Sequence, residues 1–218
     1  MTKEDPIHKA KKPALAVDVI LFTVENEILK VGLMKREEDP YFGKYALPGR
    51  FVRYKEPIED TAKKVLESKC KIKPDNVFLN QLYIFGQDLN RDTRIRTVTV
   101  VYYALVKVKD IMFHQKSGFE WHDVTNLPKL AFDHKEIVEF AVNKLRKKSL
   151  HDLLVFNLMP SEFTLTELQK THEAILNEEV DKRNFRKKLK EMKVVKSLKK
   201  YKRDGPHRPA QLYCFIKE

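Results

Sequence analysis

The chain has 218 residues, of which 42% are apolar and 10% aromatic, and this composition excludes an intrinsically disordered or collagen-like protein. Its formal net charge of +12 favours an anionic partner, and its two cysteines, Cys70 and Cys214, are too few for a disulfide framework or a cysteine metal cluster. Residues 1–13 lack the apolar stretch of a secretory signal, and the longest apolar run is far shorter than the ~18 residues of a membrane span. We therefore expect a soluble cytoplasmic protein with no membrane partner.

The first 150 residues or so begin with a predicted β-hairpin. Residues 14–22 (ALAVDVILF) form an apolar run that predicts a strand, and the polar turn at residues 25–27 leads into a second strand at residues 28–34. Pro57 is then expected to open a helix with one apolar face. The residues of that face are Ile58, Ala62, Val65 and Leu66.

Two β-rich runs follow, at residues 82–85 and 97–106, and the second is apolar on both faces, which predicts a place inside a sheet. Residues 119–121 predict a short strand, and residues 135–147 predict an amphipathic helix. The expected buried stripe of that helix consists of Ile137, Val138, Phe140, Ala141 and Leu145. Strands and helices in this order indicate a mixed sheet covered by helices.

A change of pattern near residues 146–149 predicts a boundary between two domains, residues 1–150 and 151–218. After a short apolar segment at residues 153–160, Thr164 and Glu167 have the spacing of a capping box, in which both side chains satisfy amides at the start of a helix. The expected core face of that helix contains Leu165, Leu168, Ala174 and Ile175.

Asp181 can cap a further helix, whose inward face is expected to contain Phe185, Leu189 and Met192. Alternating strands at residues 194–198 and 211–216 follow, joined by a basic tip at residues 201–209. A helix, a turn, a basic helix and a basic-tipped hairpin, in this order, are typical of a winged helix-turn-helix.

The positive charge is concentrated in this second domain. Between Lys182 and Arg208 there are thirteen basic and two acidic residues, a net charge of +11. Such a segment can be a solvated surface, but here the helix and the hairpin tip share the charge, which favours binding to DNA phosphates and base edges. The candidate DNA-contacting residues are Thr164, Thr166, Lys182, Arg183, Asn184, Arg186, Lys187, Lys190, Arg203 and Arg208.

Four segments of the second domain resemble, in the right order, the winged-helix half of the Nudix-related transcriptional regulators, the NrtR family. They are residues 163–169, 173–176, 181–189 and 208–215. The resemblance implies a homodimeric DNA-binding regulator with an N-terminal Nudix-like sensor, an inverted-repeat operator, and release of DNA on effector binding.

An active Nudix domain needs a glycine loop, a first glutamate, and three further glutamates on a helix that hold Mg²⁺ against a pyrophosphate. Residues 47–52 resemble the loop, with Arg50 in place of its second glycine, and Glu56 stands at the first glutamate. The three metal-binding positions, however, are occupied by Val65, Ser68 and Lys69. We therefore expect no metal site, no cofactor, no catalytic residues and no Mg²⁺-dependent hydrolysis.

An inactive Nudix-like domain can still bind a ligand, and arginine side chains on loops and strand ends suit phosphates. Residues 88–96 also resemble a stretch near the ligand pocket of the family, which implies a small phosphorylated effector, either ADP-ribose-like or a pentose derivative. The candidate effector-binding residues are Arg36, Arg50, Arg53, Asp88, Arg91, Arg94 and Arg96. The alternative, that most of these arginines are exposed or ion-paired, stays open. His134 is expected at the start of a helix rather than as a metal ligand.

The sequence thus predicts an α+β protein, with a Nudix-like α/β/α sandwich on a mixed sheet followed by a winged helix-turn-helix. The expected function is that of a ligand-responsive repressor. Two alternatives stay open: a Nudix hydrolase with a basic accessory domain, and an RNA-binding or ribosome-associated module.

Overall fold

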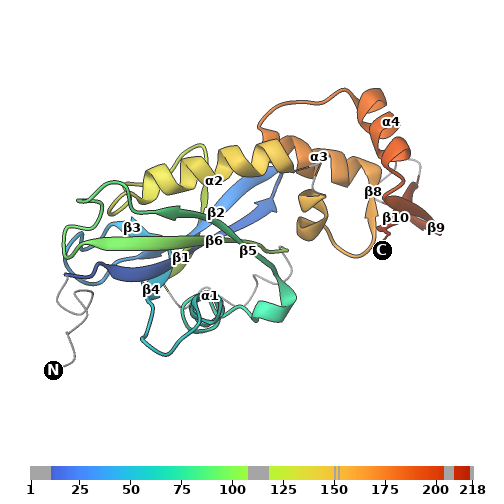
Figure 1. Ribbon diagram of the computed structural model, residues 1–218. Helices are drawn as coiled ribbons and strands as arrows, with labels where there is room; N and C mark the ends of the chain where they lie inside the picture. The colour runs from blue at the N-terminus through green and yellow to red at the C-terminus, as the bar shows by residue number, and fades with distance from the viewer. Residues whose placement is uncertain (1–10, 108–117, 150, 152, 204–208, 217–218) are drawn as a thin grey trace.

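The computed structural model describes residues 11–107, 118–149, 151, 153–203 and 209–216. Its N-terminal unit is built on a seven-stranded sheet, with helix α1 (Ile58–Ser68) on one face and helix α2 (His134–Lys148) on the other (Figure 1). The predicted α/β/α sandwich is therefore confirmed. Among the described residues, no helix combines the length and the hydropathy needed to cross a membrane.

The predicted hairpin opens the sheet. Strand β1 (Ala14–Glu25) pairs antiparallel with β2 (Ile28–Lys35). The turn residues Asn26 and Glu27 both have positive φ, as a two-residue hairpin turn of type I′ requires. On its other side β1 pairs in parallel with β6 (Thr97–Leu105), which makes the sheet mixed.

Strand β6 lies inside the sheet, as its two apolar faces predict, between β1 and the edge strand β5 (Phe78–Phe85). Strand β5 begins earlier than residue 82, where the sequence pattern placed its start. Three short strands complete the sheet, and a single 3₁₀ turn, η2 (Pro74–Asn76), precedes β5. The short strands are β3 (Tyr45–Ala46), β4 (Gly49–Phe51) and β7 (Phe119–Asp123).

The two helices bury the faces that their periodicity predicts. Helix α1 buries Ala62, Val65 and Leu66. Helix α2 buries four of the five expected residues, whereas Phe140 is only partly buried. Its ring instead lies against Tyr83 and Phe85 of the edge strand, with centroids 5.1 and 5.5 Å away.

The C-terminal unit has the elements of a winged helix-turn-helix. A 3₁₀ segment, η4 (Leu154–Leu158), leads to the short strand β8 (Phe163–Thr164) and helix α3 (Leu165–Leu176). Helix α4 (Lys182–Met192) follows, and strands β9 (Val195–Lys202) and β10 (Ala210–Phe215) form a sheet with β8 in the order β8-β10-β9.

Both predicted helix caps are confirmed. The Thr164 hydroxyl accepts from the amide of Glu167 at 3.1 Å, and the Glu167 carboxylate accepts from the amide of Thr164 at 2.7 Å. The Asp181 carboxylate accepts from the amide of Asn184 at 2.8 Å. Each cap satisfies amides that have no partner within the helix, which explains where α3 and α4 begin.

The two units share an apolar cluster that runs from the α2 side of the sheet through η4 to Phe163, Leu168 and Phe185. Helix α2 ends at Lys148, near the predicted domain boundary at residue 150, but the apolar packing continues across this point. The boundary therefore stays a prediction.

Candidate functional site

A cavity of about 480 Å³ opens in the N-terminal unit beside β3 and β4, and its wall extends to the N-terminal end of α2. Four of the seven residues predicted to bind an effector line this cavity. They are Arg36, Arg50, Arg91 and Arg94. The other three predicted residues, Arg53, Asp88 and Arg96, do not line it.

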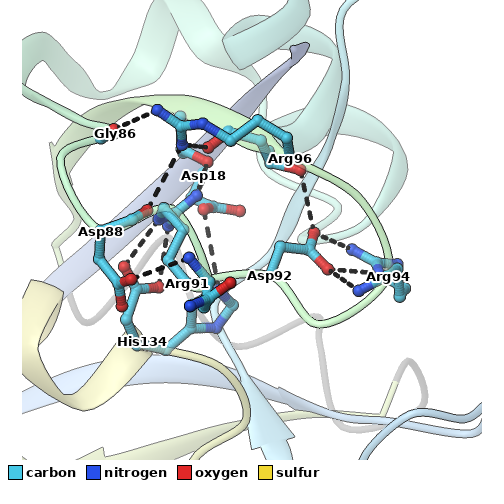
Figure 2. Close-up of polar contacts among 12 residues, drawn as sticks. Asp18, Gly86, Asp88, Arg91, Asp92, Arg94, Arg96 and His134 are labelled. Atoms are coloured by element: carbon cyan, nitrogen blue, oxygen red, sulfur yellow. Dashed lines mark hydrogen bonds and ion pairs between the residues drawn. The ribbon is translucent and has the colours of Figure 1, made fainter.

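The side chains of Arg91 and Arg94 each pair with a carboxylate (Figure 2). Arg91 is buried and binds Asp133 through two nitrogens, at 2.7 and 2.9 Å, and it also donates to Thr99. Arg94 likewise forms a bidentate ion pair with Asp92, with N–O distances of 3.0 and 2.8 Å. The predicted alternative of ion-paired arginines therefore holds for both, although both still reach the cavity.

Two aromatic rings stand beside the cavity arginines. The Arg94 guanidinium lies 5.4 Å from the ring centroid of Phe51 and 4.9 Å from that of Phe132, and Arg36 lies 5.0 Å from Phe132. Phe51 is 41% exposed. The rings fix the direction of the guanidinium groups through cation–π contacts and give the cavity an apolar wall. Neither ring was predicted from the sequence.

The three residues outside the cavity have local contacts instead. Arg96 donates to the carbonyl oxygens of Gly86 and Thr97, at 2.5 and 3.1 Å, and so closes the loop that carries Arg91 and Arg94. Asp88 accepts from the amide of Asn90 at 2.8 Å. The side chain of Arg53 is exposed to solvent.

Two buried titratable residues of the cavity are Asp18 of β1 and His134 of α2, which are 8% and 6% exposed. Burial raises the pKa of Asp18 to about 7 and lowers the pKa of His134 to about 3. An ion pair would shift both values in the opposite directions, so the contact between Asp18 Oδ2 and His134 Nε2, at 3.8 Å, is not a salt bridge. His134 begins α2, as the sequence predicts.

Asp18 was missed by the sequence analysis, although the sequence contains a signal. It is the only charged residue in the apolar run of residues 14–22. A carboxylate inside such a strand is rare without a partner or a function. Gly49 allows its placement, because a Cβ on that residue would lie 1.9 Å from Asp18 Oδ1.

The three positions that bind metal in active Nudix domains do not converge here. Val65 is fully buried, and the Ser68 hydroxyl donates to the Lys64 carbonyl at 2.5 Å. Lys69 does reach the cavity, where its ammonium donates to the Gly49 carbonyl at 2.5 Å. Among the described residues, no three Asp, Glu, His or Cys side chains are grouped so that they could hold a metal ion.

Glu56, at the first glutamate position, is also neutralised. It lies 3.2 Å from Arg50 and 2.8 Å from Lys64, and the hydrogen bond from Lys64 holds the pKa of Glu56 below its usual value. With Val65, Ser68 and Lys69 at the three metal-binding positions and Glu56 paired with two cations, these residues do not fit a divalent metal ion.

A second candidate site is the outer face of α4. Phe185 and Leu189 are buried against the domain, and the predicted DNA-contacting residues of this helix are all exposed. They are Lys182, Arg183, Asn184, Arg186, Lys187 and Lys190. At 100° per residue, Arg183, Lys187 and Lys190 lie opposite the buried face, so one side of the helix carries most of the charge.

The remaining candidates have different positions. Thr164 is buried and its hydroxyl caps α3, whereas Thr166 is exposed. Arg203 is exposed just after β9, and Arg208 lies outside the described residues. Helix α4 and strand β9 lie together at the end of the molecule away from β3 and β4 (Figure 1).

The comparisons with known proteins agree with both halves of the chain. The family model of the NrtR DNA-binding winged helix domain matches residues 155–215. A relative from Acinetobacter baylyi, named ADPR responsive transcriptional repressor NtrR, is 35% identical over 210 residues, which cover 93% of this chain and 82% of the relative.

Two solved structures of Shewanella oneidensis NrtR are also similar. The complex with a 27mer DNA superposes with a TM-score of 0.81 at 31% identity, and the match covers 93% of each chain. The NUDIX domain in complex with ADP ribose superposes with a TM-score of 0.56 at 32% identity, covering 66% of this chain and 94% of that domain.

Proposed function

This chain belongs to the NrtR family of transcriptional regulators, and we propose that it is a ligand-responsive repressor in which α4 binds duplex DNA and the cavity binds a phosphorylated effector of the ADP-ribose type. One observation carries the proposal. The chain has an exposed basic helix at one end and a separate cavity with cationic walls near the other. Allosteric control requires two such distinct sites.

On the DNA side, we propose that α4 lies in the major groove. Arg183, Asn184 and Arg186 have side chains that can hydrogen-bond to base edges, and Lys187 and Lys190 suit phosphates. Further contacts to the DNA backbone would come from Lys182, Thr166, Arg203 and Arg208. Thr164 would act indirectly, through the cap of α3. The similarity to Shewanella NrtR, solved with DNA, supports this assignment.

On the effector side, we propose that Arg36, Arg50 and Arg94 bind the phosphates. All three residues line the cavity, and Phe51 offers an exposed ring on which a base or sugar can stack. Arg91 would stabilise the cavity wall through its ion pair, and the adjoining loops would be stabilised by Arg53, Asp88 and Arg96. The NUDIX domain of Shewanella NrtR, solved with ADP ribose, supports this class of ligand.

We further propose that the protein senses its effector without hydrolysing it. Mg²⁺-dependent hydrolysis needs several carboxylates on one face of the α1 region, and here Val65 is buried while Lys69 places a positive charge in the cavity. This proposal disfavours the alternative of a Nudix hydrolase with an accessory domain. Incubation with ADP-ribose and Mg²⁺ tests it, and turnover at ordinary enzyme rates would contradict it.

The chain is proposed to act as a homodimer on an inverted repeat, as the family resemblance implies. Two α4 helices related by a two-fold axis would enter half-sites about 34–36 Å apart, or a multiple of this spacing. An effector could bind more tightly to a dimer conformation in which the distance between the two α4 helices does not match the half-sites. It would then release the DNA by shifting the population towards that conformation.

Helix α2 is the element that we propose to couple the two sites. Its C-terminal end contacts α3, because Arg146 Nε donates to the Ile175 carbonyl at 3.0 Å and Ser149 Oγ lies 3.3 Å from His172 Nδ1. The His172 ring stacks on Phe185 of α4, with centroids 5.6 Å apart. A shift of α2 would thus reach the DNA-binding helix through packed groups.

Two experiments test the proposed function. Selection from a random duplex pool should enrich an inverted repeat, and competition with structured RNA should not displace it; preferential binding of RNA would instead favour the ribosome-associated alternative. A thermal-shift screen should identify the effector among ADP-ribose, nicotinamide nucleotides and phosphorylated pentoses. A ligand at one hundred times its Kd adds about 2.7 kcal/mol to the stability of the native state.

A further inference from the structure

The outer side of the edge strand β5 has no partner strand. Strand β5 pairs only with β6, and beyond that ladder its backbone makes no backbone hydrogen bond to another described strand or loop. In an edge strand the N–H and C=O groups of alternate residues point outward and can pair with a further strand. Proteins usually block such an edge with charged side chains or proline, but β5 contains neither. Its ladder with β6 is interrupted once, by a register shift between Gln81 and Tyr83.

The segment around β5 is also apolar for a surface. Residues 76–87 form the longest stretch of the chain without a charged side chain, although 34% of all residues are charged. Ten large apolar side chains are exposed in the described part of the chain, and four of them lie within thirteen residues, on β5 and the loop that follows it. They are Tyr83, Ile84, Leu89 and Ile95, with exposed fractions of 46%, 49%, 64% and 49%. Such a concentration marks a contact with another molecule.

The loop that follows β5 is held against the end of that strand. Arg96 donates to the carbonyl oxygens of Gly86 and Asp88, at 2.5 and 3.4 Å (Figure 2). Leu89 and Ile95 directly follow and precede Asp88 and Arg96 in the sequence, so this closure keeps them beside β5. The strand and the loop therefore present one continuous surface.

A second copy of this chain is the partner that fits this surface. Because the chain has a net charge of +12, two copies repel each other where charged faces meet, and an uncharged strand avoids that repulsion. An edge strand is also complementary to itself, since two antiparallel copies exchange the same backbone hydrogen bonds about a two-fold axis. Such a contact is closed, so it produces a dimer and not a fibre. A nucleic acid, by contrast, requires positive charge that β5 lacks.

We propose that two copies of the chain associate through their β5 strands and the loops that follow, so that their two sheets become continuous. This inference rests on the homodimer of the proposed function and adds the surface that forms it. Arg91 and Arg94 of the same loop line the cavity, so a bound effector acts directly beside the contact between the copies. A change in that contact alters the distance between the two α4 helices, as the proposed release of DNA requires.

Sedimentation velocity of the full-length protein over a range of concentrations tests the proposal. The wild type should sediment as a dimer. Ile84→Lys places like charges near the axis in both copies, so it should weaken dimerisation by at least about 30-fold. Because Ile84 is exposed, the variant should keep the circular dichroism spectrum of the wild type. Ile216→Lys is the matched control, since Ile216 is 42% exposed in the DNA-binding unit, and it should change dimerisation by less than about threefold.

Hydrogen exchange of the wild type locates the contact without any variant. The outward amides of β5 should exchange more slowly at protein concentrations above the dimer Kd than below it, and Ile84→Lys should remove this difference. If Ile84→Lys does not fold, the exchange of the wild type decides the matter. A monomeric wild type, a dimer that Ile84→Lys does not weaken, or a dimer whose β5 amides stay unprotected would overturn the proposal.

Failure of the proposed function has a different signature. A protein that dimerises through β5 but does not bind or release DNA keeps this inference and refutes the regulatory mechanism. A dimer that binds and releases DNA but is built on another surface does the reverse.

Discussion

Arg91 and Asp133 form a bidentate ion pair, with N–O distances of 2.7 and 2.9 Å. Because Asp133 directly precedes α2, this ion pair joins the cavity wall to the start of that helix. The helix has 15 residues and so spans about 22 Å. Its far end contacts α3 of the DNA-binding unit. A ligand that moves Arg91 can therefore move the C-terminal end of α2.

Replacing Arg146 by alanine should uncouple the two sites. The variant loses the hydrogen bond from α2 to the Ile175 carbonyl, while the cavity and α4 remain intact. We expect the affinities for effector alone and DNA alone to change by less than about threefold, whereas the effector-induced loss of DNA affinity falls from about 5–150-fold towards none. Binding assays with and without effector measure this. Lys147→Ala, on the same helix turn but exposed, should keep the full coupling.

Arg186 and Lys199 should affect DNA binding in different ways. Arg186→Ala is expected to cost about 1–3 kcal/mol on the selected operator and much less on random DNA, since it removes a side chain that reads bases. Lys199, exposed on β9, should contribute only charge, so Lys199→Ala lowers both affinities alike and reduces the salt slope by about one. Equal effects of Arg186→Ala on specific and random DNA would contradict its assigned role.

Replacing Thr164 should mainly lower the stability of the fold, whereas replacing Thr166 should mainly weaken DNA binding. Thr164→Ala removes the hydroxyl of the capping box and should lower the free energy of unfolding by about 1 kcal/mol. Thr166 is exposed, so its replacement by alanine should change stability by less than about 0.5 kcal/mol and weaken DNA binding instead. Denaturant unfolding and operator titrations on both variants test the pair. A large loss of stability in Thr166→Ala would contradict the prediction for this residue.

Asp18 should make stability depend on pH. Burial raises its pKa from 3.8 to about 7, so between these values the native state holds a proton that the unfolded state has lost. The associated stability is present below pH 4 and is lost as the pH rises towards and through 7. Relative to Asp18→Asn, which does not titrate, the wild-type free energy of unfolding should fall by about 1–3 kcal/mol between pH 4 and pH 8. Denaturant unfolding across this range measures the difference, and a constant difference would contradict it.

Much of the fold could be predicted because its elements carry clear periodic patterns. The β1–β2 hairpin, α1, α2 and the winged helix all have long amphipathic or apolar runs, and the caps at Thr164 and Asp181 follow local rules. Strands β3 and β4 are only two and three residues long, too short for any period to show. The first half of β5 was missed because an exposed edge strand that includes Asn80 and Gln81 does not alternate.

The cavity was harder to predict than the fold. Which arginines line it depends on partners far away in sequence, such as Asp133, which lies 42 residues from Arg91. Arginine content alone could not separate Arg94, which reaches the cavity, from Arg96, which closes a loop. A lone charge in an apolar strand, as at Asp18, was the more informative signal.

The proposed mechanism requires that effector binding, without metal chemistry, releases DNA. Fluorescence anisotropy of a labelled, selected operator tests this most directly, with ADP-ribose or a phosphorylated pentose titrated into the complex in EDTA. We expect the anisotropy to fall to that of free DNA, with the same midpoint when Mg²⁺ replaces EDTA and with the effector recovered intact. Release that requires Mg²⁺ and accompanies cleavage of the effector, or no release by either class of ligand, would contradict this mechanism.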